Sequence, residues 1–209
     1  GSSAFSSCYS LTAVIWNSTQ AKPYNAFEGC DNIETFVFGD SITIIPQNTM
    51  VGYSSSWNRT NIRKMVFGSG LTSIASDAFI YIYNVDTIMC KASVPPTLGN
   101  ANSLPGYSTT IDVLMVPCES TPAYLANTSW SSHFTDIVGD VHISGNADKL
   151  AVNNPAYGNV NYDCSTGQMT AEANYGYHFV QWNDGNTQNP RSVSLAGDVL
   201  YTAIFAKNI

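Results

Sequence analysis

The stretch AFSSCYSLTAV at residues 4–14 recurs as AFEGCDNIETF at residues 26–36, 22 positions further along the chain. A third copy, AFIYIYNVDTI, occupies residues 78–88, and the shorter segment NIRKMVF lies between them at residues 61–67. Several apolar positions keep their register in these copies at once. Such self-similarity is the signature of a solenoid, in which each repeat folds as one coil.

The second half of the repeat recurs as well. FGDSITII at residues 38–45 matches FGSGLTSI at residues 67–74, an offset of 29, and the seven residues beyond 22 correspond to an inserted loop, YSSSWNR at residues 53–59. Each unit reads as two short extended segments separated by turns rich in Gly, Asn, Asp and Ser. We therefore predict a mainly β fold that begins with a solenoid of about four short coils.

Alternation along the first segment of each repeat assigns an inner and an outer side. The predicted inner side chains stack from coil to coil and form the core, since no single repeat can bury them alone. They are Leu11, Val14, Trp16, Ile33, Phe36, Phe38, Ile62, Met65, Phe67, Val85, Ile88 and Cys90.

An apolar row is predicted on the outer side of the same segments. It consists of Ile15, Val37, Val66 and Met89, with Ala13, Thr35, Lys64 and Thr87 facing out beside it. An exposed apolar row across adjacent coils is a candidate binding surface. The alternative is that the row packs on a neighbouring domain or only raises strand propensity.

The inserted loop offers a second candidate contact site, formed by Tyr53, Trp57 and Arg59. Loops that interrupt a repeat often lie on the binding face. The alternative is that Trp57 folds back and shields the neighbouring coil.

The pattern Ala-Phe-x-x-Cys-x-x-Leu-x-x-Val, followed by Ile-x-x-Ile, resembles the BspA-type leucine-rich repeat of bacterial surface proteins. The later sequence resembles that family's terminal cap in KASVPPTL at residues 91–98, LMVPC at residues 114–118, Tyr124 and Trp130. Pro95 and Pro96 cannot donate to a strand ladder, and a cap must cover the last coil. The segment from Ile111 to Val116 reads as a closing strand, Thr121-Pro122 as the start of a short helix, and Trp130, Phe134 and Ile137 as the cover.

A second module follows. GYHFVQWNDGN at residues 176–186, NPR at residues 189–191 and GDVLYTAIF at residues 197–205 resemble the internalin B-repeat-like (Listeria–Bacteroides repeat) module. Alternation in these stretches independently predicts strands, and Asp184-Gly185 marks a tight turn. We predict two domains, residues 1–139 for the solenoid with its cap and residues 140–209 for a small β-rich domain.

Composition excludes some partners. The chain has 8 Lys and Arg against 15 Asp and Glu, a formal net charge of −7, and no local basic cluster. Nucleic acid and anionic membranes would be repelled. No apolar run is long enough to be a transmembrane segment, and no leader opens the chain, so we expect a leader, an anchor and earlier repeats to lie outside it.

The cysteines and histidines give no chemical signature. Cys8 and Cys30 share a repeat position that holds Ile82 in the third copy, so we expect buried free thiols; the alternative is a cross-coil disulfide. Cys90 and Cys118 end neighbouring cap strands, and either pairing or free thiols fit them. The three histidines are not spaced as ligands, and the oxygen-rich stretch at residues 184–189 lacks the later acidic ligand of a calcium loop. We predict no metal, no cofactor and no catalysis.

Three functions fit these features. The first is a non-catalytic binding or adhesion module, extracellular on a bacterial surface, whose partner is a host or neighbouring-cell surface protein. The second is glycan capture at the cell envelope through exposed aromatics such as Trp57, Tyr53 or Trp182. The third is a mechanical spacer for another domain.

Overall fold

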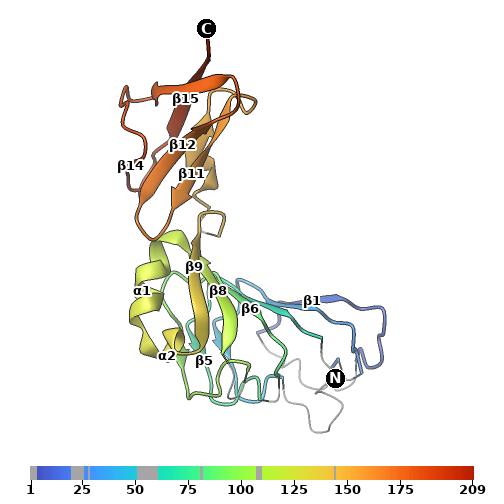
Figure 1. Ribbon diagram of the computed structural model, residues 1–209. Helices are drawn as coiled ribbons and strands as arrows, with labels where there is room; N and C mark the ends of the chain where they lie inside the picture. The colour runs from blue at the N-terminus through green and yellow to red at the C-terminus, as the bar shows by residue number, and fades with distance from the viewer. Residues whose placement is uncertain are drawn as a thin grey trace. The chain divides into compact units, whose positions relative to one another are not determined.

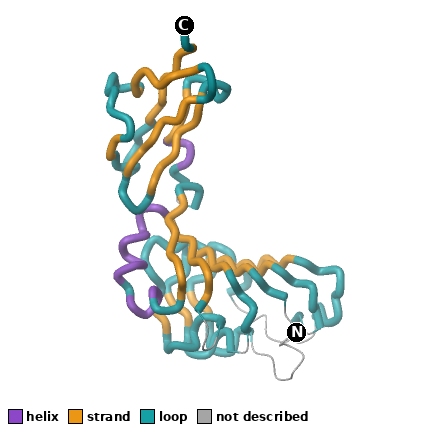
Figure 2. The backbone as a smooth tube through the Cα atoms, viewed as in Figure 1, coloured by secondary structure: helices purple, strands orange, loops and turns teal. Residues whose placement is uncertain are grey.

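The computed structural model describes residues 4–19, 26–27, 29–50, 61–80, 82–106, 110–143 and 145–209. The chain divides into two compact units, Gly1–Val138 and Gly139–Ile209. Both consist mainly of β-strands with short helices, which confirms the predicted mainly β fold class with a parallel-strand solenoid and a small β-rich C-terminal part (Figures 1 and 2).

The first unit is organised around a six-stranded sheet whose order is β1-β2-β4-β6-β8-β9. Its strands are β1 (Ala13–Trp16), β2 (Thr35–Phe38), β4 (Lys64–Phe67), β6 (Thr87–Cys90), β8 (Ile111–Pro117) and β9 (Phe134–Asp140). The pairs from β1 to β8 are all parallel, so each repeat contributes one strand before the chain winds back. A second sheet, β3-β5-β7, collects the other half of each coil in β3 (Ile44–Ile45), β5 (Ser73–Ile74) and β7 (Thr97–Leu98).

A column of phenylalanine rings runs through the coils between these elements. We call it the aromatic spine; its members are Phe5, Phe27, Phe36, Phe38, Phe67 and Phe79. The Phe5 and Phe27 rings stack with centroids 5.2 Å apart, and the Phe67 and Phe79 rings stack at 5.8 Å. Equivalent side chains of successive repeats therefore share one core, as the repeat alignment predicts.

The coils approach each other closely where glycines recur at one repeat position. A Cβ atom on Gly68 would collide with the backbone carbonyl of Gly39 in the preceding coil. Only glycine allows this contact between turns. The Phe-Gly pairs at residues 38–39 and 67–68 thus each combine a core side chain with a site of tight stacking.

The solenoid ends in a cap formed by the helices α1 (Thr121–Ala126) and α2 (Thr128–Ser131), preceded by the 3₁₀ turn Cys118–Ser120. The helices lie beside the β8–β9 end of the sheet (Figure 1). Tyr124 and Trp130 are fully buried against each other, with ring centroids 5.3 Å apart. The Trp130 Nε1–H donates to the Pro96 carbonyl at 2.7 Å, which ties the cap to the coil beneath it.

The second unit contains two three-stranded sheets. One has the order β10-β15-β13, formed by β10 (Leu150–Val152), β15 (Tyr201–Lys207) and β13 (Tyr177–Trp182); the other has the order β11-β12-β14, formed by β11 (Gly158–Asp163), β12 (Gln168–Ala173) and β14 (Arg191–Ser192). The 3₁₀ turn Ala147–Lys149 leads into β10. The core consists of Met169, Ala171, Trp182, Ala203 and Phe205.

Candidate functional site

The outer face of the six-stranded sheet carries the predicted apolar row. Ile15 pairs with Val37 in the strand register, Val37 with Val66, and Val66 with Met89. The register continues from Met89 to Met115 on β8, a residue that the repeat pattern did not reveal because the cap strand no longer follows the repeat sequence. We call these five side chains the outer row.

Exposure varies along the outer row. Ile15 is 71% exposed, whereas Val37, Met89 and Met115 are half-buried. Val66 is only 7% exposed, so the expectation that it is an exposed member of the row was wrong. Val66 lies on the central strand β4, between Val37 and Met89 in the register, whereas Ile15 lies on the edge strand β1. The outer row is therefore continuous in register but is open to solvent mainly at Ile15.

A second row of side chains flanks the outer row on the same face. Ala13, Thr35, Lys64, Thr87 and Val113 lie side by side on successive strands. Lys64 is the charged residue in this row, although the chain as a whole has a formal net charge of −7. The face combines an apolar stripe with threonine hydroxyls and one ammonium group.

Tyr53, Trp57 and Arg59, the loop residues of the second candidate site, lie outside the described residues. The prediction that this loop contacts a partner therefore stays a prediction.

The shared repeat position of Cys8 and Cys30 does not bury both thiols. Cys30 is buried and its Sγ–H donates to the Phe5 carbonyl at 2.8 Å, while Cys8 is exposed. Both thiols are free. The expectation of two buried thiols was right for Cys30 and wrong for Cys8, because the turn that holds Cys8 is solvent-exposed from residue 4 to residue 10.

Cys90 is a free and fully buried thiol, so the pairing of Cys90 with Cys118 considered from the sequence does not form. The Tyr124 hydroxyl lies 3.2 Å from the Cys90 sulfur and donates to the Ala92 carbonyl at 2.9 Å. Burial raises the pKa of Cys90 to about 11, which keeps the thiol protonated at neutral pH. Its role is to fill the core under the cap.

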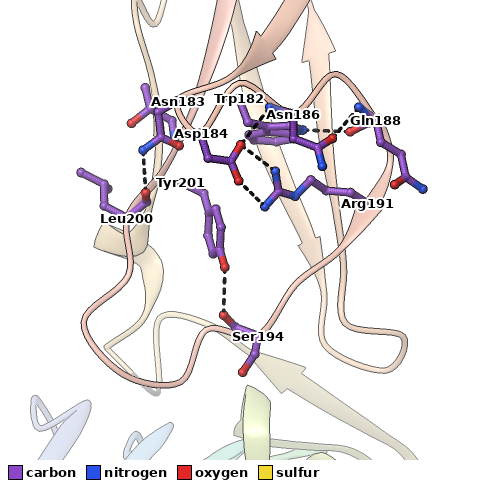
Figure 3. A network of polar contacts seen from close by, with 10 residues as sticks. Trp182, Asn183, Asp184, Asn186, Gln188, Arg191, Ser194, Leu200 and Tyr201 are labelled. Carbon is purple, nitrogen blue, oxygen red and sulfur yellow. Dashed lines mark hydrogen bonds and ion pairs between the residues drawn. The ribbon is translucent and has the colours of Figure 1, made fainter.

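Trp182, one of the aromatics considered for glycan capture, is fully buried in the C-terminal unit, so it cannot stack on a sugar. Its Nε1–H donates to the Gln188 carbonyl at 2.9 Å, and Phe179 packs against it with ring centroids 5.2 Å apart. Period-two alternation does not distinguish a core tryptophan from an exposed one. The hydrogen bond from the Trp182 ring to the Gln188 carbonyl in the following loop holds the ring in the core (Figure 3).

Arg191 organises the polar network that surrounds Trp182 (Figure 3). Its guanidinium contacts the Asp184 carboxylate at 2.8 Å and lies 5.8 Å from the Trp182 ring and 5.2 Å from the Tyr201 ring. The hydrogen bond from Arg191, followed by one from the backbone N–H of Asn186, lowers the pKa of Asp184. These contacts give Arg191 a structural role in the C-terminal unit.

The same network bears on the oxygen-rich stretch at residues 184–189. One Asp184 oxygen accepts from the Asn186 N–H at 3.1 Å, and the Asn186 side chain accepts from the Gln188 N–H at 2.7 Å. These side chains satisfy their own loop, as in an Asx turn. Within the described ranges, no group of three or more His, Cys, Asp or Glu side chains is placed to hold a metal ion.

A parallel sheet built from one strand per repeat, stacked through a shared core and closed by a cap, defines the first unit as a leucine-rich-repeat solenoid. Comparison with known families agrees: residues 1–95 match the BspA type leucine-rich repeat region in six copies. Residues 148–209 match the divergent InlB B-repeat domain. The chain therefore combines a BspA-type leucine-rich repeat region with a divergent InlB B-repeat domain, as the sequence motifs indicate. No curated protein gave a match.

Both matched modules are non-catalytic repeat modules of kinds that are typical of bacterial surface proteins. No helix in the described part of the chain combines the length and apolar character that a membrane span requires.

Proposed function

We propose that this chain is a non-catalytic binding module of a bacterial cell-surface protein, and that it recognises a protein partner through the outer face of its six-stranded sheet. The observation that supports this proposal is the outer row, in which apolar side chains of five successive strands stand in direct register. Neighbouring strands lie about 4.8 Å apart, so the row extends over roughly 19 Å on a rigid backbone.

A preformed row of this kind favours a macromolecular partner. Binding to a fixed sheet does not require ordering of the backbone, which reduces the entropic cost of association. Half-buried methionines at one end of the row, Met89 and Met115, adapt their shape to a partner. The threonines and Lys64 beside the row supply the polar contacts that a protein interface needs around its apolar centre.

The compartment and the domain organisation belong to the same proposal. We place the protein outside the cell, on the bacterial surface, with a host or neighbouring-cell protein as the partner. The two matched families are typical of that location, and the acidic, sparsely charged sequence disfavours nucleic acid. We further propose residues 1–139 and 140–209 as two separate domains, with recognition assigned to the first.

Two exposed isoleucines allow a matched test. Ile15 is 71% exposed on the outer face, and Ile44 is 59% exposed on β3 of the other sheet. Binding of the chain to an array of extracellular-matrix proteins would identify a partner, and Ile15→Glu and Ile44→Glu would then be compared on that partner. Neither side chain belongs to the core, so both variants should unfold at nearly the wild-type temperature.

We expect Ile15→Glu to weaken the interaction at least tenfold and Ile44→Glu to leave it unchanged, since a carboxylate at an apolar contact must be desolvated without a partner. Equal effects of the two substitutions, or an effect of Ile44→Glu alone, would contradict the assignment of the outer face. Failure of every matrix protein to bind the intact chain would count against the proposed class of partner.

A further inference from the structure

Cys8 and Cys30 come together at the first turn of two successive coils. They occupy the same position in the repeat, 22 residues apart, and the coils that carry them are joined by the Phe5 N–H, which donates to the Ala26 carbonyl at 2.8 Å. The stacked Phe5 and Phe27 rings hold the same two turns together. The Cys8 side chain also hydrogen-bonds the Cys30 sulfur, so the two thiols are direct neighbours.

The two thiols differ in their access to solvent. Cys8 is exposed, while Cys30 is buried with its Sγ–H directed at the Phe5 carbonyl. Burial raises the pKa of the Cys30 thiol, and the neighbouring Cys8 sulfur adds to this effect. A dissolved reagent therefore reacts with the exposed Cys8 first, and the buried Cys30 thiol is close enough to react with Cys8 afterwards.

We propose that Cys8 and Cys30 form a thiol–disulfide exchange site, in which a small dissolved disulfide of the glutathione type converts the pair into a disulfide between the first two coils. This role is independent of the proposed recognition by the outer face. The geometry suits the bond, because Cys8 and Cys30 precede the paired parallel strands β1 and β2, and neighbouring strands lie about 4.8 Å apart, within the range of Cα distances that disulfides span.

The chemistry proceeds in two exchanges. The Cys8 thiolate attacks one sulfur of oxidised glutathione, which gives a Cys8–glutathione mixed disulfide and releases one glutathione thiolate. Cys30 then loses its proton to solvent, and its thiolate attacks the Cys8 sulfur and expels the second glutathione. The protein gains one S–S bond and loses two protons and two electrons, and oxidised glutathione is reduced to two molecules of glutathione.

The reaction differs from the behaviour expected of an isolated surface thiol. A lone exposed cysteine would stop at the mixed disulfide, whereas the adjacent Cys30 removes the glutathione again. The disulfide links two coils that are otherwise held by the stacked Phe5 and Phe27 rings, and Phe5 is 49% exposed.

The test uses the intact chain with Cys8 and Cys30 as thiols, incubated with oxidised glutathione, alkylated to block the remaining thiols and analysed by peptide mass mapping. The expected product is a peptide pair joined through Cys8 and Cys30, two hydrogens lighter than the sum of its parts and free of glutathione. Cys90 is the internal control. It is a fully buried free thiol whose sulfur lies against the Tyr124 hydroxyl, and it should react only after unfolding.

Two variants separate the steps. Cys30→Ala, at a position where another copy of the repeat holds Ile82, should accumulate the stable Cys8–glutathione adduct. Cys8→Ser should give neither adduct nor cross-link. A wild-type chain that keeps glutathione on Cys8, that leaves both thiols unmodified in the folded state, or that joins Cys8 to Cys90 instead would overturn the proposal.

Discussion

Truncation of Phe38 probes the stacking of the coils most sharply. Phe38 is 2% exposed, and its ring centroid lies 5.0 Å from that of Phe36, 6.0 Å from that of Phe67 and 5.7 Å from that of Phe79. These partners come from the same coil and from the next ones along the chain, so Phe38→Ala opens a cavity between repeats. Replacing a buried phenylalanine by alanine costs about 3–5 kcal/mol of unfolding free energy.

That loss is a large fraction of the stability of an ordinary domain, which is about 5–15 kcal/mol. Ile15→Ala is the control, because Ile15 also lies on a strand of the sheet but is 71% exposed; it should cost less than about 1 kcal/mol. The assay is hydrogen exchange of the peptides that contain β2, β4 and β6 across a urea series, which reads the first unit separately from the second. Equal losses in the two variants would refute the shared core.

Two further predictions concern the cap and the C-terminal unit. Tyr124→Phe removes the hydroxyl that donates to the buried Ala92 carbonyl, and should lower the unfolding free energy by about 1–3 kcal/mol, measured by urea denaturation. The pKa of Asp184 is held below its ordinary value of 3.8 in the folded state, so the stability that its pair with Arg191 contributes is present above about pH 4 and is lost as the pH falls through the folded pKa. The difference in thermal midpoint between wild type and Arg191→Met should therefore shrink below pH 4; a difference that stays constant down to pH 2 would contradict this.

The repeat alignment predicted much of the solenoid because stacking constrains the sequence at every coil. The 22-residue offset places Phe36 against Met65 and Phe38 against Phe67 once the inserted loop is discounted, and the strand register has these same pairs. Because each such position must be apolar in every copy, the apolar pattern recurs along the sequence and predicts the stacked core.

The same alternation did not predict how exposed each outer side chain is. Val66 and Ile15 have equivalent places in the repeat, yet one is buried and the other exposed. Ile15 lies on the edge strand β1 and Val66 on the central strand β4, and a single-strand pattern does not contain the order of the strands in the sheet. Met115 was missed because β8 pairs with β6 in the sheet although its sequence does not follow the repeat pattern.

Contacts outside the strand pattern also decided the aromatic and cysteine assignments. Trp182 is buried because the loop that follows it returns and accepts its Nε1–H through Gln188, a closure that the strand pattern of residues 177–182 cannot express. Cys8 is exposed although it shares a repeat position with the buried Cys30, because burial at that position depends on the surroundings of each turn.

Methionine methyl NMR tests recognition by the outer face most directly, when the intact chain is titrated with a protein partner that binds it. The chain has five methionines; Met89 and Met115 lie in the outer row, while Met65 and Met169 are fully buried in the cores of the first and second units. Our account predicts that the Met89 and Met115 signals shift on binding and that the Met65 and Met169 signals keep their positions. Saturated binding that shifts Met169 and leaves Met89 and Met115 unchanged would contradict it.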